Sequence, residues 1–362
     1  MLDPMSPTKQ AIARAALVDA GGMQVVDDAQ WDELVARLDA DDVYLRLDYH
    51  RASAELEPVP ALPVLLHWRS EDGAEVALPL LLRALPGGLD GWDATSAYGY
   101  GGPIAANGTT IDTAAFGAAL DTWARANRAA ATFLRFHPLL ENARLAPATA
   151  ELIELGSTVA WDVSAERGEL LPLMHSHHRR AARKADRAEL EVRVTAGATD
   201  LTAFRAMYDD TMRRQEAADF YFFPDAYWEA LVATGAGGEL VLIEGLLDGE
   251  PVAAQLCFAR GPWLHYHLGA SADAARAIGA SNRCFLAAAE WAQSRGMTRF
   301  HLGGGVGGGS DSPLFVFKHR YDPSSEPHPF HVAKLVHDVE LYRAAAGTDS
   351  TAGYFPPWRA PA

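Results

Sequence analysis

The densest group of residues that could do chemistry is a basic segment at residues 175–187, HSHHRRAARKADR. Its single acid is Asp186, and its five cations are Arg179, Arg180, Arg183, Lys184 and Arg187. At helical spacing, Arg179, Arg183 and Arg187 share one face of a helix, and Arg180 and Lys184 share the next. In a chain of formal net charge −16, such a stripe indicates phosphate binding as readily as a solvated helix face.

A second candidate is Lys318, within the segment FVFKHRY at residues 315–321. A lysine beside a binding crevice can stabilise an oxyanion or a phosphate. The alternative is an edge segment whose cations snorkel into solvent. Residues 303–309 come just before it and contain six glycines in seven residues, without the Lys-Ser/Thr end of a P-loop. We expect this run to be a mobile loop at the end of a strand beside a crevice, or else a flexible connector.

A third candidate comprises Arg276, Gly279 and Ser281, between an expected strand and a long helix. Backbone amides at a helix N-terminus beside an arginine suit the diphosphate of coenzyme A. The alternative is a plain loop in which Ser281 caps the helix. His265 and His267 would share one face of a strand, either as a polar face or with one of them as a general base. They have no evident third ligand, so no metal site is expected.

Composition excludes several classes of protein. The 362 residues are 49% hydrophobic and 22% charged, which fits two folded domains. The negative net charge disfavours DNA and anionic membranes as partners. The two cysteines, Cys257 and Cys284, lie in apolar stretches, so buried free thiols are expected. Arg14 interrupts the apolar stretch near the N-terminus and no apolar run reaches membrane-spanning length, so we expect a cytoplasmic protein.

Hydrophobic periodicity predicts the same succession of elements in both halves of the chain. Two Asp-Gly hairpin turns, at 72–73 and 248–249, lie 176 residues apart, and strands starting at 132 and 298 lie 166 apart. This near-constant offset predicts a duplicated domain. Expected helices cover 29–38, 113–127, 201–216, 225–233 and 281–294. Expected strands cover 43–47, 64–68, 76–82, 132–137, 240–246, 252–259, 263–268 and 298–302.

The predicted domains are residues 1–163, residues 164–340 and a tail at 341–362. Their boundary is placed at the polar segment SAERGELLPL, residues 164–173. We expect the last segment of the second half, residues 330–342, to pack back on the first half.

Taken together, these segments resemble FemABX-like proteins, a tandem-domain branch of the GNAT acyltransferases. In the second half the resemblance rests on the basic helix, a helix with Tyr208 and Arg214, the aromatic segment 220–228, residues 291–296 and Phe317-Lys318. In the first half it rests on residues 98–103 and 135–138. It covers the chain from about residue 43 to residue 342.

The resemblance implies an α/β (α+β) fold of two GNAT-like domains, each a mixed, mostly antiparallel sheet flanked by helices, which meet at a crevice. Proteins of this family transfer an amino acid from aminoacyl-tRNA to the amine of a peptidoglycan precursor. Lys318, beside Phe317, matches the family's Phe-Lys lysine near the transferred group, and Arg214 matches a substrate-phosphate arginine. The family's phosphate-binding lysine of the first domain has no match, and the second domain lacks room for a long helical arm.

The leading hypothesis is therefore an aminoacyltransferase acting on an amine of a peptide or small molecule. Tyr98, Tyr100, Arg179, Arg183 and Lys184 are further candidates for substrate binding. One alternative is an N-acyltransferase that binds acyl-coenzyme A at residues 276–281, and another is a non-catalytic binding protein of the same fold. Aminoacyl-tRNA or acyl-coenzyme A would serve as co-substrate, without a resident cofactor. Nothing in the sequence fixes the oligomeric state.

Overall fold

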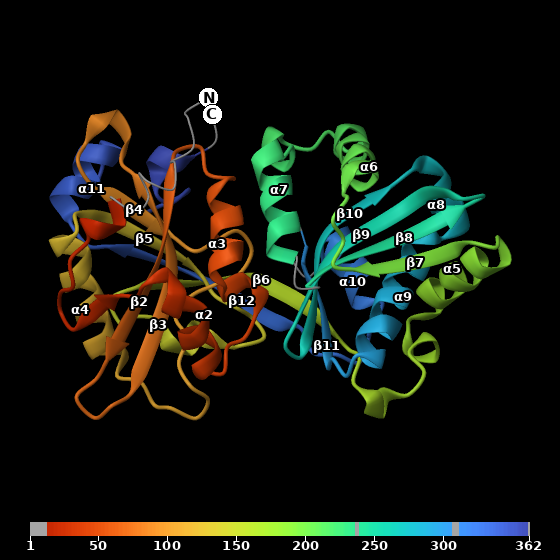
Figure 1. Ribbon diagram of the computed structural model, residues 1–362, viewed down its shortest axis with the longest axis horizontal. Helices are drawn as coiled ribbons and strands as arrows, with labels where there is room; N and C mark the ends of the chain where they lie inside the picture. The colour runs from red at the N-terminus through yellow and green to blue at the C-terminus, as the bar shows by residue number, and fades with distance from the viewer. Residues whose placement is uncertain (1–12, 236–238, 306–310, 361–362) are drawn as a thin grey trace. The chain divides into compact units, whose positions relative to one another are not determined.

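The computed structural model describes residues 13–235, 239–305 and 311–360 (Figure 1). The chain forms two compact units, the first comprising residues 1–154 and 330–362, and the second residues 155–329. Among the described residues, none of the helices is both long and apolar enough to cross a lipid bilayer.

The first unit contains a mixed sheet in the strand order β1-β2-β3-β4-β5-β12. Neighbouring strands are antiparallel except β4 and β5, which are parallel. The turn between β2 and β3 contains Gly73, whose φ of +89° favours glycine. The strands are β1 (Met23–Val25), β2 (Ala61–Arg69), β3 (Glu75–Ala84), β4 (Trp92–Thr95), β5 (Ala129–Arg135) and β12 (His328–Val336).

Helices cover both faces of this sheet. On one face, α4 (Thr113–Ala126) begins where the Asp112 carboxylate accepts hydrogen bonds from two backbone amides, and it buries Trp123 in the largest core of the unit. A separate core contains Trp31 of α2 (Asp28–Arg37) and Leu65 of β2. Helix α3 (Leu47–Ala54) packs on β2 and β3, and α11 (Val339–Ala346) contacts β5.

The second unit repeats this arrangement in the strand order β7-β8-β9-β10-β11-β6. Again all neighbours are antiparallel except one pair, here β10 and β11. The strands are β6 (Glu151–Asp162), β7 (Glu191–Ala196), β8 (Leu240–Leu247), β9 (Glu250–Arg260), β10 (Trp263–Ser271) and β11 (Arg299–Gly304).

Alternate residues of these strands face two helical layers. Cys257 of β9 lies in the core beneath α9 (Ala280–Ser294), whereas the next residue, Phe258, contacts His267 on the other face. Helix α5 (Ser176–Arg187) packs against α9. On the opposite face, α6 (Thr202–Arg214) packs on β10 and α7 (Asp225–Thr234) packs on β8. Two short helices, α8 (Asp273–Ile278) and α10 (Pro313–His319), follow β10 and β11.

The predicted fold class is confirmed, since each unit is a mixed, mostly antiparallel sheet flanked by helices. The unit boundaries lie elsewhere than the predicted domain boundaries. Most of β6 belongs to the second unit because it pairs with β11, and residues 330–336 of β12 belong to the first because they pair with β5. Residues 164–173, the predicted boundary, lie inside the second unit. The expected return of residues 330–342 to the first unit agrees with its limits.

Residues 43–45 and 313–319 are among the segments that differ from the expected elements. Residues 43–45 form a 3₁₀ turn, not a strand, because the Asp42 carboxylate accepts a hydrogen bond from the Tyr44 amide and caps the turn. Residues 313–319 form helix α10, which starts at Pro313 after Ser312 accepts a hydrogen bond from the Phe315 amide. Of the predicted glycine-rich loop at 303–309, residues 306–309 lie outside the described part of the chain.

A hydrogen-bonded chain with the buried His337 at its centre joins α4, β5 and the segment after β12. His337 Nδ1 lies 2.6 Å from an Asp121 carboxylate oxygen, and His337 Nε2 lies 2.9 Å from the Thr132 hydroxyl. We expect His337→Leu to lower the free energy of unfolding by about 1–3 kcal/mol, because it leaves a buried hydroxyl unpaired. Urea unfolding measures this loss. In the double variant with Thr132→Val the two losses should be less than additive, and full additivity would contradict the coupling.

Candidate functional site

The candidate site of the second unit lies where its two parallel strands part. Strands β10 and β11 are paired only at residues 263–265 and 299–301, although β10 continues to Ser271 and β11 to Gly304. Each strand also has a register irregularity toward its other neighbour, after Tyr266 in β10 and after His301 in β11. The strand ends beyond the pairing can therefore offer backbone groups to a side chain placed between them.

Lys318 of α10 occupies this position. Its ammonium donates a 2.7 Å hydrogen bond to the Gly304 carbonyl oxygen of β11 and lies 5.6 Å from the centre of the Tyr266 ring of β10. The residue is only 7% exposed, and loss of water around the charge lowers its pKa to about 8. At neutral pH the side chain is mostly an ammonium, with N–H groups beyond the one bound to Gly304.

This arrangement suits the stabilisation of negative charge. A desolvated, fixed ammonium interacts more strongly with a developing oxyanion than a lysine in water does. Tyr266 packs on Phe285 of α9, and Phe285 packs on Phe317 and Tyr321, so aromatic rings surround the lysine stem. The chemistry supported by Lys318 and its surroundings is the binding of an oxyanion.

His178 of α5 supports α10, the helix that carries Lys318. It is fully buried, its Nε2 donates a 2.8 Å hydrogen bond to the Phe317 carbonyl, and its ring contacts Phe317 and Tyr321. Burial lowers the pKa of His178 to about 4, so the ring is neutral at pH 7. The hydrogen bond to a carbonyl requires the proton on Nε2. In the sequence, the signal for this role is limited to a histidine among small residues on one face of the helix.

The five cations of the predicted basic stripe have different environments in the structure. Arg179 donates to the carbonyl oxygens of Pro172 and Met174, so it fixes the loop before α5. Four cations are exposed and form no ion pair or side-chain hydrogen bond within the described ranges: Arg180, Arg183, Lys184 and Arg187. These four side chains, the basic face of α5, are free to meet an anionic partner.

The predicted coenzyme A loop is a tight turn between α8 and α9. Gly279 has a φ of +80°, its amide donates to the Ala275 carbonyl, and a Cβ there would lie 2.4 Å from the Ala181 oxygen of α5. Helix α5 is therefore seated against the turn. Arg276 is exposed on α8, whereas Ser281 lies in the first turn of α9 and makes no side-chain cap. The expected cap by Ser281 was wrong because Gly279 takes the N-cap position.

Arg214 connects elements of the second unit. Its guanidinium forms an ion pair with Asp273 at the start of α8 and donates to the Ser271 carbonyl and the Thr211 hydroxyl. The arginine predicted to bind substrate phosphate thus links α6 to the end of β10.

Of the two histidines of β10, His265 is buried and His267 is partly buried. His267 lies 2.8 Å from the Tyr227 hydroxyl, and burial lowers its pKa to about 3. His265 lies 3.2 Å from His301, Nδ1 to Nδ1. A ring with so low a pKa is too weak a base to take a proton from an ammonium, so the general-base interpretation of His267 is disfavoured.

Tyr98 and Tyr100 lie in the first unit, in the loop after β4. The Tyr98 backbone is held by the Ser53 hydroxyl and by the Tyr49 hydroxyl, which bonds its carbonyl. The Tyr100 ring packs edge-on against Tyr44, and burial raises the pKa of Tyr100. These tyrosines and Lys318 therefore belong to different units.

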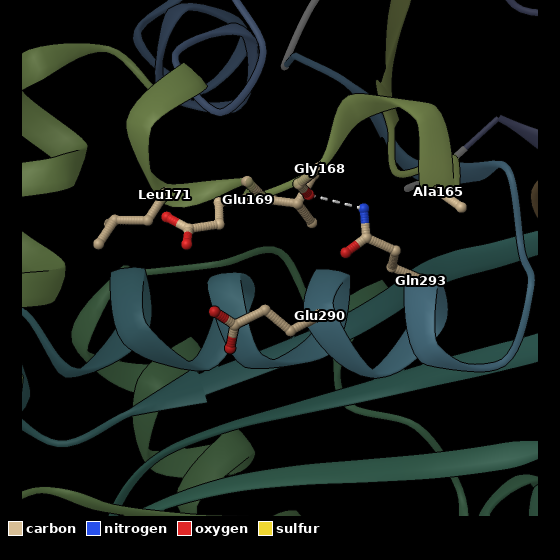
Figure 2. A pocket seen from close by; sticks show the side chains of 7 residues that line it. Ala165, Gly168, Glu169, Leu171, Glu290 and Gln293 are labelled. Carbon is tan, nitrogen blue, oxygen red and sulfur yellow. Dashed lines mark hydrogen bonds between the residues drawn. The ribbon is translucent and has the colours of Figure 1, made fainter.

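A separate hollow in the second unit lies between α9 and the loop at residues 165–171 (Figure 2). Gln293 spans it by donating to the Gly168 carbonyl, and the carboxylates of Glu169 and Glu290 line it. None of the predicted site residues lines this hollow, and two carboxylates disfavour phosphates, so we do not assign it to the substrate.

Comparisons with known proteins bear on the fold of the chain. Residues 174–311, within the second unit, match the acetyltransferase (GNAT) domain family. No curated protein matches the sequence. The crystal structure of FemX is similar at a TM-score of 0.64 and 14% sequence identity, over 89% of this chain and 99% of that chain.

Two further solved structures share the fold. The C-terminal domain of a putative lysylphosphatidylglycerol synthetase from Agrobacterium fabrum has a TM-score of 0.53 at 16% identity, covering 91% of this chain and 99% of that one. A tandem GNAT protein from the clavulanic acid biosynthesis pathway has a TM-score of 0.50 at 12% identity, covering 87% and 98%. These likenesses show the fold of tandem GNAT proteins.

The neutral, buried His178 predicts a pH-dependent stability. Its folded pKa of about 4 is below the ordinary 6.5, so the unfolded chain binds more protons between these values. The contribution of neutral His178 to the free energy of unfolding is complete above pH 6.5 and is lost as the pH falls toward 4. We expect His178→Phe to reduce the slope of unfolding free energy against pH in this window by up to about 1.4 kcal/mol per pH unit. The exposed neighbour His177, changed to Phe, is the matched control. Equal slopes in both variants, measured by urea unfolding, would contradict the assignment.

Proposed function

We propose that this chain, which carries a GNAT domain at residues 174–311 within a tandem GNAT fold, is an aminoacyltransferase. It would move an aminoacyl group from aminoacyl-tRNA to an amine of a peptide or small molecule, such as a peptidoglycan precursor. The observation that carries this proposal is the buried ammonium of Lys318 at the parting of β10 and β11. Lys318 lies in the second unit, seven residues beyond the segment that matches the GNAT family, and it has an N–H group to offer an oxyanion.

The chemistry follows from the ester of the donor. The neutral acceptor amine attacks the carbonyl carbon, and the carbonyl oxygen takes the negative charge of a tetrahedral intermediate that Lys318 stabilises. The C–N bond forms, the C–O bond of the ester breaks, and the ribose hydroxyl leaves. The proton lost by the attacking nitrogen passes to the leaving oxygen through water or a base. No acyl-enzyme is needed.

Two observations support an RNA donor over acyl-coenzyme A. The α8–α9 turn, where a diphosphate would meet backbone amides, is occupied by α5, and the Gly279 amide already bonds Ala275. The basic face of α5 offers four cations that form no ion pair with the described residues, in a chain of net charge −16. Arg276 is exposed beside this turn and keeps acyl-coenzyme A as the second candidate donor. Calorimetry with acetyl-coenzyme A distinguishes the two.

The first test compares donors and removes the lysine. Radiolabelled amino acids should pass from a mixed pool of charged tRNAs to small molecules of a cell extract, and acetyl groups from acetyl-coenzyme A should not. In Lys318→Met the turnover should fall by roughly two to three orders of magnitude, as when an oxyanion donor is lost. Affinity for tRNA should stay nearly unchanged.

Lys318→Met should fold, because methionine keeps most of the apolar stem and removes a charge whose burial is unfavourable. Saturable acetyl-coenzyme A binding with no response to tRNA would favour an acyl-coenzyme A enzyme. A folded variant with normal turnover would exclude Lys318 from the reaction, and no transfer from either donor would favour a binding protein.

The second test concerns the basic face of α5. Changing Arg180, Arg183 and Lys184 together to Gln should weaken tRNA binding and reduce the slope of log K against log salt by about 2, since each phosphate contact contributes close to one ion. The melting temperature should change little because the side chains are exposed. The control removes three exposed arginines elsewhere, Arg144, Arg193 and Arg295. If both triple variants weaken tRNA binding equally, the loss of affinity would be due to net charge alone.

A further inference from the structure

One face of the first unit's sheet carries more cations than the carboxylates there can neutralise. Arg83 of β3 bonds Asp93 of β4 at 2.6 Å and Glu57 at 2.7 Å. Arg359, near the C-terminus, bonds the other oxygen of Asp93 at 2.9 Å. Asp93 is fully buried and also accepts a hydrogen bond from the indole of Trp358. Both oxygens of Asp93 are therefore engaged, whereas Glu57 bonds Arg83 through one oxygen.

A third arginine, Arg135, lies at the end of β5 near this network. The fields of Glu57, Arg83, Tyr98 and Tyr354 act on its guanidinium, and the loss of water around it lowers its pKa. Arg135 forms no ion pair and no side-chain hydrogen bond with any residue of the described ranges. Its guanidinium carbon lies 5.1 Å from the centre of the Phe133 ring.

An arginine so placed is unusual because a desolvated charge is normally paired. Arginine stays protonated at any pH at which the protein folds, so it cannot escape the cost by losing its proton. The residue is also partly exposed, so a ligand can reach it from outside. The network thus has a surplus positive charge with five N–H donors that no described carboxylate uses.

We propose that Arg135 is the anchor of an oxyanion-binding site in the first unit, which takes the carboxylate or phosphate group of a ligand. The planar guanidinium presents paired N–H groups that match two oxygens of either anion. The guanidinium also lies over the Phe133 ring in a cation–π contact.

The backbone around Arg135 is built to stay in place. The Ser96 hydroxyl accepts a hydrogen bond from the Arg135 amide at 3.0 Å. The loop that carries Tyr98 then passes close to the Arg135 carbonyl, where a Cβ on Gly101 or Gly102 would approach it at 3.5 and 3.4 Å. A rigid strand end fixes the guanidinium, which lowers the entropy lost when an anion binds.

This site stands independently of the proposed aminoacyl transfer. The two proposals would be connected if the acceptor of the aminoacyl group carried a free carboxylate or phosphate that binds at Arg135. Because the binding test below needs no donor, no turnover and no Lys318, its failure would leave the transfer proposal untouched, and the converse holds too.

The test measures binding of inorganic phosphate and of acetate, each by calorimetry and by melting temperature, at constant ionic strength held with chloride. We expect at least one of them to bind saturably to the wild-type chain and raise its melting temperature. Binding by phosphate alone identifies a phosphate site, and binding by acetate identifies a carboxylate site. Arg135→Gln should raise the apparent Kd by about tenfold or more, as expected for loss of a charge-assisted hydrogen bond.

Two further variants keep the result interpretable. Arg144→Gln removes an exposed arginine of the same unit and should bind as the wild type does. Arg135→Lys keeps the charge without the paired donors, so it should fold even if the glutamine variant does not, and bind several-fold more weakly. The proposal is overturned if the wild type binds neither anion saturably, or if the Arg135 variants bind as tightly as Arg144→Gln.

Discussion

The candidate site depends on one interaction, the hydrogen bond from the Lys318 ammonium to the carbonyl of Gly304. A lysine that is 7% exposed loses most of its hydration, and a carbonyl with an aromatic face replaces only part of it. The interaction exists because β10 and β11 separate after three paired residues, so the end of β11 is paired with β6 but not with β10. The charge is therefore held where it is unfavourable for stability and effective for binding an oxyanion.

In the first unit, the two parallel strands do not separate in this way. Its parallel strands, β4 and β5, remain joined beyond Thr95, because the Ser96 amide donates to the Phe133 carbonyl and the Ser96 hydroxyl accepts from the Arg135 amide. One serine thus continues the ladder that the second unit interrupts. The two units share a strand order but differ in their candidate chemistry, with an ammonium inside one sheet and an unpaired guanidinium at the strand end of the other.

Helix α5 links several features of the second unit. Its small residues allow close approach, so the Ala181 carbonyl meets the turn at Gly279 and His178 reaches the carbonyl of Phe317. Its opposite face keeps the exposed cations. One helix therefore supports the lysine, covers the turn where a diphosphate would bind, and presents positive charge.

Periodicity predicted the elements with strong patterns. The hairpin turns at Gly73 and Gly249 and the long helices α4 and α9 lie close to where the alternation of apolar residues placed them. Strand β6 was missed because it alternates weakly and has its partner, β11, far away in sequence. Most of β6 belongs to the second unit and most of β12 to the first because each pairs with a strand far away in sequence. No local pattern encodes such pairing.

The candidate site could be predicted only in part for the same reason. Lys318 was found through its motif, but its partners come from residues 266 and 304, and its support comes from residue 178. Arg179 and Arg214 have the residue types for binding phosphate, yet nearby carbonyls and an aspartate occupy them. Whether a cation is free depends on neighbours that the sequence order does not reveal.

The most direct measurement of the central claim is the pKa of Lys318 in the folded chain. The sequence has only four lysines, Lys9, Lys184, Lys318 and Lys334, so NMR of lysine labelled with ¹³C at Cε gives few signals. The Lys318→Met spectrum assigns the one of interest. The structure predicts that this signal titrates near pH 8. If all four lysines titrate near the ordinary value of about 10.4, Lys318 is not the desolvated ammonium on which the proposed reaction depends.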